Sequence, residues 1–223
     1  SIYGSSAGSV IGAYMVSRQF VMDVYVDILP STKGDFVCLK RLWKSICMDV
    51  LHSTLSRGGA TSETSRSTRA SPPPGLNTSF ILDQVMHPER GVRPLDLQAF
   101  LKNNHDQPLY VASTYAENGR PVAHCFSSPA FTSVQGPEGR DPAVLACLQA
   151  SMNVPGAAGP PVRIRNPTNQ TTTRSYFDAF CCEPLPYRSA VAHGATHWNV
   201  LCTGPDGKHP MPKPSLYESG IEP

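Results

Sequence analysis

The segment Gly4-Ser5-Ser6-Ala7-Gly8 constrains the fold most, because it requires a sharp turn between two different elements. Apolar Ile2-Tyr3 before it predicts a strand end, and small and apolar residues from Ser9 to Arg18 predict a helix after it. A G-x-S-x-G turn between strand and helix projects the hydroxyl of its central serine clear of the backbone. We expect both flanking glycines to be required, because a side chain there would strike neighbouring backbone. Ser6 is therefore the candidate nucleophile.

Strands and helices alternate along the rest of the chain, which favours an α/β fold. Asn118-Gly119 is a typical two-residue hairpin turn, Asp141-Pro142 predicts a helix start, and Gly194 predicts a helix end. The apolar residues from Val24 to Leu29 fit either a strand or a helix, and this choice stays open. We expect strands at 109–113, 121–127, 175–177 and 198–202, and helices at 95–102, 141–150 and 187–193.

The region from 53 to 79 differs from its surroundings in composition. Nearly half of it is Ser or Thr, and Pro72-Pro73-Pro74-Gly75 lies near its end. Such a segment buries too little apolar surface to order itself, so we predict a flexible insertion. Before it, apolar residues at steps of three and four predict a helix from Asp35 to His52. The basic face of that helix, with Lys40 and Lys44, suits lipid headgroups, whereas its apolar face suits packing on a sheet.

Charge and cysteine content exclude several classes of protein. The chain has 19 basic and 17 acidic residues and a net charge of +2, which excludes a strongly basic nucleic-acid-binding protein. It lacks an uncharged apolar run long enough for a transmembrane helix. Its seven cysteines are irregularly spaced without C-x-x-C, which argues against disulfide frameworks and zinc sites and indicates a reduced, intracellular protein. Because Ser1 leads directly into an apolar strand, we expect a piece of a longer protein.

A nucleophilic serine needs a base, and late histidines are one source. An α/β-hydrolase esterase uses Ser, then Asp or Glu, then His in chain order. His193, His197 and His209 are the candidates for this triad. His193 and His197 also have the spacing of metal ligands on a helix, but Gly194 between them argues against one continuous helix.

Three blocks of this chain, taken in order, resemble the patatin-like phospholipases and related lipid acyl hydrolases. The blocks are Gly4 to Gly8; Leu148 to Gly156 with Pro160-Pro161; and Tyr176-Phe177-Asp178 through Glu183 to Arg188, up to Gly194-Ala195. The pair of strands around Asn118-Gly119 is similar to the central hairpin of that family. Together these blocks cover roughly half of the chain.

The resemblance implies a three-layer α/β/α sandwich around a central mixed sheet. Residues 1–204 would form part of that catalytic domain, with the insertion at 53–79 and a Pro-rich tail at 205–223. It implies hydrolysis of phospholipid, galactolipid or acylglycerol esters through an acyl-enzyme, without metal or cofactor. The protein would then act at the periphery of a membrane or lipid droplet. The implied site residues are the nucleophile Ser6, the base Asp178, and the elbow residues Gly4, Ala7 and Gly8.

The sequence departs from that family in two places. Ala179-Phe180 follows Asp178 where the family has Gly and a small residue, so we expect Phe180 to crowd the loop. Asp206-Gly207 matches the Asp-Gly pair of the family, but it follows the last expected strand. This position favours Asp178 over Asp206 as the base. The family's Gly-rich oxyanion loop is not in this chain, which leaves the Ala7 N–H as a donor. We therefore expect an active longer parent and a weak or inactive chain 1–223; a non-catalytic lipid-binding relative is the alternative.

Overall fold

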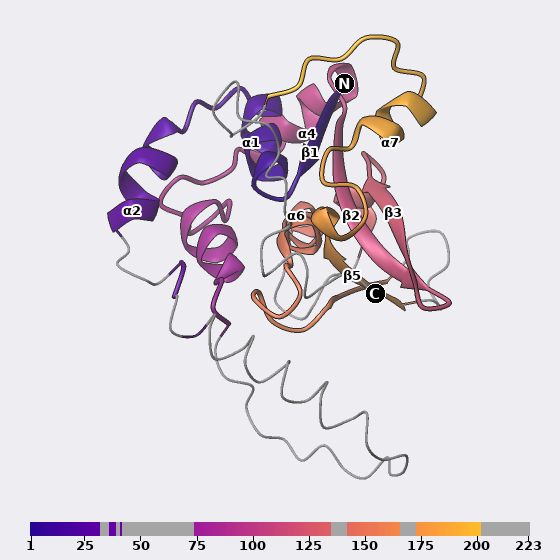
Figure 1. Cartoon of the computed structure of the whole chain (residues 1–223). Coiled ribbons are helices and arrows are strands. Elements are labelled where there is room, and N and C mark those ends of the chain that lie inside the picture. Colours follow the sequence, from indigo (N-terminus) through magenta and orange to yellow (C-terminus); the bar gives the residue numbers. More distant parts are fainter. Residues whose placement is uncertain (32–35, 39–40, 42–73, 135–141, 166–172, 202–223) are drawn as a thin grey trace, which may run out of the picture.

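A computed structural model describes residues 1–31, 36–38, 41, 74–134, 142–165 and 173–201 (Figure 1). The strands are β1 (Ile2–Ser5), β2 (Leu109–Glu117), β3 (Arg120–Phe126), β4 (Val162–Arg165) and β5 (Thr173–Asp178). The α-helices are α1 (Ala7–Val16), α2 (Leu29–Ser31), α4 (Leu97–Asp106), α5 (Ala130–Ser133), α6 (Ala143–Met152) and α7 (Tyr187–Ala192). Two π-helical segments, η1 (Val24–Ile28) and η3 (Phe80–Val85), and one 3₁₀ turn, η4 (Ala179–Cys181), complete the elements. The α/β class is confirmed.

The strands form a mixed sheet built around the long strand β2. β3 pairs antiparallel with residues 111–117 of β2. β1 pairs parallel with residues 109–112 of β2, and β5 pairs antiparallel with residues 113–115. A strand has only two edges for pairing, so β1 and β5 follow each other end to end along the edge opposite β3. β4 pairs with β5 and extends the sheet beyond it (Figure 1).

The two faces of this sheet carry different helices. Gly12 of α1 lies against Ile2 and Leu109, and α6 packs on β2 and β5. On the other face, Tyr3 and Tyr110 stack on each other and against His193 at the end of α7. Because neighbouring residues of a strand point to opposite faces, Leu109 and Tyr110 assign these contacts to the two faces. We call them the α6 face and the α7 face.

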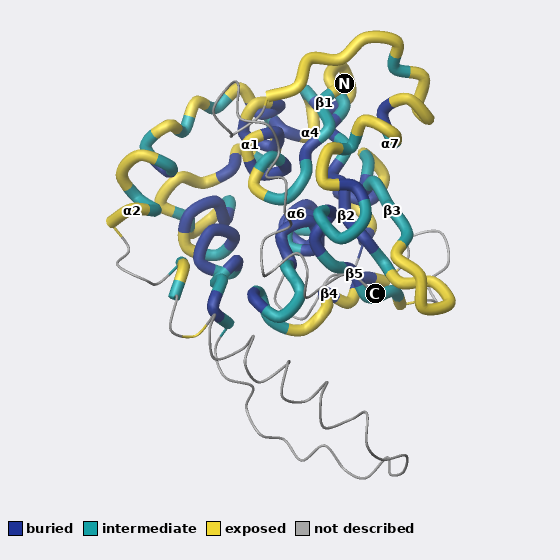
Figure 2. The backbone as a smooth tube through the Cα atoms, in the orientation of Figure 1, coloured by how far each residue is buried: buried dark blue, intermediate teal, exposed yellow. Residues whose placement is uncertain are grey.

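The main core lies under the α6 face. It combines buried residues of α1, α6 and β2 with Phe100 of α4 and Phe131 of α5, whose rings meet edge to face. Figure 2 shows α6 and much of β2 as buried, whereas α7 and the segment after it are largely exposed. Among the described residues, no helix has the length and apolar character needed to cross a membrane.

The structure confirms the hairpin and most of the expected helices. β2 and β3 are joined through Asn118 and Gly119, which both have positive φ, at 52° and 75°. This is the backbone that a type I′ turn requires. The open choice at 24–29 is resolved as helical, since η1 continues into α2. Gly194 with φ 87° follows α7, as expected.

One expected strand is wrong, and the start of one expected helix differs. Residues 198–201 form no strand, and Trp198, Val200 and Leu201 are exposed and have no strand partner in the described sheet. The helix expected from Asp35 does not include Val37, which forms an isolated antiparallel bridge with Leu76, whereas Arg41 is helical. Most of that helix, residues 53–73 of the insertion and the tail lie outside the described residues.

The end of the expected insertion is part of the fold. Leu76 N–H donates to the Ala157 carbonyl and Asn77 N–H donates to the Phe36 carbonyl, and Thr78 is buried. Strand β4 and the helical segments α5 and η3 were not expected from the sequence. β4 shows alternating burial over its four residues, but Pro160-Pro161 and its short length hid this pattern.

Candidate active site

Ser6 occupies a strained corner between β1 and α1. Its φ is 50° and its ψ is −125°, a conformation that residues other than glycine rarely adopt. Holding such a residue costs about 1–3 kcal/mol and needs support from the surrounding structure. Although Ser6 is at the N-cap of α1, its hydroxyl makes no capping hydrogen bond. The hydroxyl is therefore available for chemistry.

Buried serines on either side hold this corner in place. The Ser6 N–H donates to Ser151 Oγ of α6 at 3.0 Å, and Ser9 Oγ donates to the Ser6 carbonyl at 2.6 Å. Ser9 and Ser151 are both fully buried. Buried polar groups need hydrogen-bond partners. These two bonds pair the N–H and the carbonyl of Ser6 and so hold its backbone in this conformation.

The two glycines of the elbow play unequal roles. A Cβ on Gly4 would lie 2.5 Å from Ser9 Cα and 2.8 Å from the Gly8 carbonyl oxygen, which no side chain can do. A Cβ on Gly8 would meet nothing within 4 Å, so the expectation that Gly8 is required for close packing is wrong. The reason is geometric: Gly4 faces the first turn of α1, whereas Gly8 lies in that turn and faces open space. Ala7 is exposed and begins α1.

The sheet register brings Ser6 and Asp178 together from opposite directions. Ser5, the last residue of β1, pairs with Ala112 of β2. Asp178, the last residue of β5, pairs with Ser113, the next residue of the same strand. Because β1 and β5 share one edge of β2, their carboxyl ends meet at this point. The fold thus brings together two residues that are far apart in the chain.

Asp178 is buried and only partly satisfied. It is 1% exposed, its N–H donates to the Asn153 carbonyl at 3.0 Å, and its Oδ1 accepts the Phe180 N–H at 2.8 Å. Within the described residues its Oδ2 has no hydrogen bond of ordinary geometry. Burial raises the pKa of this carboxyl above its usual value, and the Phe180 N–H and the Ser6 side chain oppose that rise. Ser6 therefore lies close enough to Asp178 to favour its charged form.

The loop after Asp178 accommodates the two residues that depart from the family pattern. Ala179 is buried in the 3₁₀ turn, and Phe180 contributes its N–H to the carboxylate. The hydrogen bond to Asp178 comes from the backbone N–H of Phe180, and any residue other than proline would supply the same donor. The expected crowding by Phe180 is therefore not seen, because its half-buried side chain is tolerated beside this turn.

The histidine candidates lie elsewhere or outside the described residues. His193 Nδ1 is hydrogen-bonded to Tyr3 Oη at 3.0 Å, and its ring stacks on Tyr3 and lies tilted against Tyr110 on the α7 face. His197 is exposed and bonds Thr196. His209 and Asp206 lie outside the described residues. Among the described hydrogen bonds, none joins a histidine to Ser6.

The start of α1 supplies a donor near the serine. Ala7 is the first residue of the helix, so its N–H is among the first four, which have no partner within a helix. The positive end of the helix dipole also lies there. In the described part of the chain, no three His, Cys, Asp or Glu side chains lie close enough together to hold a metal ion.

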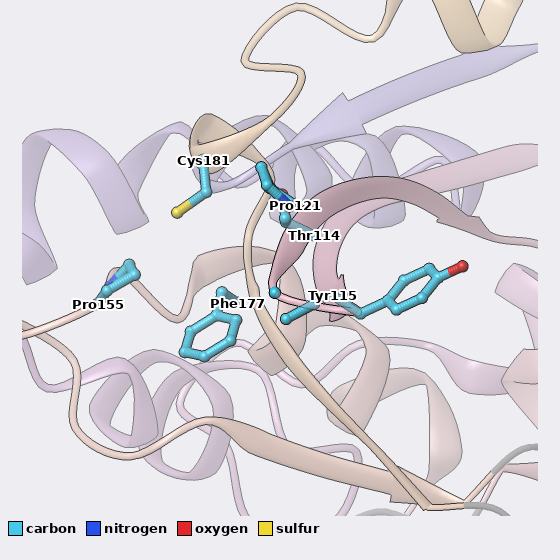
Figure 3. A pocket seen from close by; sticks show the side chains of 8 residues that line it. Thr114, Tyr115, Pro121, Pro155, Phe177 and Cys181 are labelled. Atoms are coloured by element: carbon cyan, nitrogen blue, oxygen red, sulfur yellow. The ribbon is translucent and has the colours of Figure 1, made fainter. Parts of the chain in front are cut away.

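A mostly apolar hollow of about 270 Å³ adjoins the strand that carries Asp178 (Figure 3). Phe177 before Asp178 and Cys181 after it both line the hollow, and Pro155 closes it from the segment after α6. The remaining lining comes from the β2–β3 hairpin: Thr114, Tyr115, Ala116, Gly119 and Pro121. In Figure 3 the ring of Tyr115 points away from this space. Pockets for drug-sized ligands start at about 300 Å³, so this one fits only part of a long apolar chain.

Two supporting residues, Ser151 and Asn153, received no role from the sequence. Ser151 holds the backbone of Ser6, and the carbonyl of Asn153 holds the backbone of Asp178. The Asn153 side chain also donates to the Pro160 carbonyl at 3.0 Å. The signal that could have found them is the Ser-Met-Asn triplet within the second family-like block, placed at the end of a helix.

Comparison of the chain with protein-family models, with curated proteins and with solved structures finds no significant match.

Proposed function

We propose that this chain carries the catalytic centre of a lipid acyl hydrolase that cleaves carboxylic esters with a Ser6–Asp178 dyad. The observation that carries the proposal is the strained serine placed beside a buried carboxylate at the meeting point of two strands. The resemblance to patatin-like phospholipases supports the lipid class and the finer architecture of an α/β/α sandwich.

In the acylation step, Asp178 acts as general base. Its Oδ2 accepts the Ser6 hydroxyl proton while Ser6 Oγ attacks the carbonyl carbon of the ester. The Ala7 N–H stabilises the resulting oxyanion. When the tetrahedral intermediate collapses, the bond to the alcohol oxygen breaks, and the protonated Asp178 gives its proton to the leaving alcohol.

In the deacylation step, water takes the place of the alcohol. Asp178 accepts a proton from the water as its oxygen attacks the acyl carbon, and the proton then returns to Ser6 Oγ as the fatty acid leaves. The raised pKa of Asp178 makes it a stronger base than an exposed carboxylate. Each oxyanion donor contributes roughly 10²- to 10³-fold in turnover.

A fluorophosphonate probe tests the proposal without requiring full turnover. We expect covalent labelling of Ser6 in the wild-type chain and none in Ser6→Ala. Ser5→Ala is the matched control, because Ser5 is the adjacent serine on β1, and it should label normally. Failure of the folded wild-type chain to label would contradict a working nucleophile. Label on another serine, retained in Ser6→Ala, would assign the reactivity to a different residue.

A further inference from the structure

The segment after Asp178 presents an unusual number of apolar side chains to solvent. Six lie between 185 and 201 and are each exposed by nearly half or more: Leu185, Tyr187, Val191, Trp198, Val200 and Leu201. Leu201 is 84% exposed and Trp198 is 52% exposed. Figure 2 shows this segment as an almost continuous exposed stretch along one margin of the molecule. We call it the 185–201 surface.

Hydrogen bonds and stacking tie this surface to both catalytic strands. Glu183 is buried, and its carboxylate accepts from the N–H and the hydroxyl of Ser189 at the start of α7. Through Glu183 the helix is fixed to the chain that leaves Asp178. At its other end, His193 is bonded and stacked to Tyr3 of β1, three residues before Ser6. The exposed side chains are thus carried on an anchored segment.

The charge of this surface identifies the partner it suits. Between residues 184 and 201 the chain has Arg188, two histidines and no carboxylate. The Arg188 guanidinium lies over the ring of Tyr187 and its Nε donates to the Tyr187 hydroxyl. Aromatic and aliphatic side chains beside a cation suit the boundary between lipid headgroups and acyl chains, where Trp and Tyr are enriched.

A second exposed apolar set allows a direct comparison. It lies over α1 and η1 and includes Phe20, which is 89% exposed. The same segment holds Arg18 as well as Asp23 and Asp27, and Asp23 pairs with Arg93, so its positive and negative charges balance. Balanced charges gain less from an anionic surface than an arginine without a nearby exposed carboxylate does. Charge complementarity therefore favours the 185–201 surface.

We infer that the 185–201 surface docks on a lipid surface with anionic headgroups. The choice of lipid over protein as the partner rests on the proposed function. The docking itself needs no catalysis, and it places the apolar side chains of α7 in the headgroup region beside the strands that carry Ser6 and Asp178. Trp198 and Leu201 would enter the lipid, and Arg188 would contact the headgroups.

Vesicle co-sedimentation of the full chain tests this inference, with phosphatidylcholine vesicles prepared with and without phosphatidylserine. We expect binding to the anionic vesicles, weakened about tenfold or more by Trp198→Ser with Leu201→Ser, because binding scales with buried apolar area. Arg188→Gln should weaken it about fivefold at low salt. Phe20→Ser removes a more exposed apolar residue outside the surface and should leave binding unchanged.

Tryptophan fluorescence gives an independent readout of the same contact. The chain has two tryptophans, so Trp43→Phe leaves Trp198 as the remaining indole. We expect its emission to shift to the blue on anionic vesicles and to be quenched by brominated lipids. Undiminished binding of the Trp198→Ser/Leu201→Ser variant, or no binding by the wild-type chain, would overturn the inference. The Ser6→Ala chain should bind like wild type, so loss of fluorophosphonate labelling would count against the hydrolase alone.

Discussion

The two faces of the sheet differ in how completely they are covered. On the α6 face, α1, α4, α5 and α6 bury a large apolar core and supply the bonds that hold Ser6 and Asp178. On the α7 face, a helix of six residues and the segment after it cover the strands, and many of their apolar side chains remain exposed. The comparison shows that the two faces of the sheet have different roles in the fold. The buried face fixes the backbone of Ser6 and Asp178, and the open face leaves apolar side chains exposed.

The sharpest test of this division removes the nucleophile. Ser6→Ala should reduce ester hydrolysis by at least about 10⁴-fold, because covalent catalysis then stops. Vesicle binding by the α7 face should not change. Hydrolysis of a short-chain ester and co-sedimentation of the same preparation measure the two effects. Measurable hydrolysis that is equal in Ser6→Ala and wild type would remove Ser6 from the mechanism.

Replacement of the base should separate activity from stability. Asp178→Asn should lower kcat/KM by about 10³-fold, since it removes the proposed general base. The folded-state pKa of Asp178 is raised, so its stabilising contribution is present below the unfolded pKa and is lost as pH rises through the folded pKa. Asp178→Asn should therefore raise Tm at neutral pH relative to wild type, and this gain should shrink in acid. Thermal melts of both proteins at several pH values test whether the difference in Tm has this sign and this pH dependence.

The same pKa shift predicts a pH profile for the reaction. A carboxylate acts as a base only when ionised, so kcat/KM should rise with pH through the raised pKa of Asp178 and then level off. A plateau that begins at the pH typical of an exposed aspartate would contradict a desolvated base. The control is a soluble ester, for which docking on lipid plays no part.

Alanine at the two elbow glycines should have opposite outcomes. Gly4→Ala places a Cβ against the backbone of Ser9 and should cost about 1–3 kcal/mol or more, with loss of labelling at Ser6. Gly8→Ala meets open space in the first turn of α1 and should be neutral or stabilise by up to about 1 kcal/mol. Urea unfolding and probe labelling measure both. Similar losses in the two variants would contradict the local geometry.

Removal of a supporting hydroxyl should have a smaller effect. Ser151→Ala leaves the Ser6 N–H without its partner and should cost about 1–3 kcal/mol. It should also slow labelling of Ser6, because the elbow loses its alignment. Ser17→Ala is the matched control: it removes another buried hydroxyl, bonded to the Tyr14 carbonyl, at the far end of α1. Slower labelling in both variants would indicate general destabilisation.

The smallest effect on folding is expected on the α7 face. Val191 is about half exposed on α7, so Val191→Ser should change the free energy of unfolding by no more than about 0.5 kcal/mol. Val144→Ser, in the buried α6, is the contrasting change and should destabilise strongly. Comparable losses at the two positions would show that the faces are equally packed.

Local signals accounted for the features that the sequence predicted correctly. Asn118-Gly119 fixes a hairpin because both residues adopt positive φ easily, and the apolar spacing after Ser6 fixes a helix. The expected strand at 198–202 failed because an apolar run gives no information about whether a neighbouring strand has a free edge. The start of the helix expected from Asp35 was placed too early for a related reason: Val37 pairs with Leu76, a partner that the local sequence does not reveal.

The sequence by itself determined a serine at a strand-to-helix corner, because the requirement for Gly4 and the start of α1 are local to a few residues. Only the tertiary structure decided which carboxylate meets that serine, which of the two glycines is sterically required, and which hydroxyl holds the turn. The physical reason is register. β1 and β5 end at consecutive residues of β2, and only the assembled sheet brings Ser6, Asp178 and the end of α6 together.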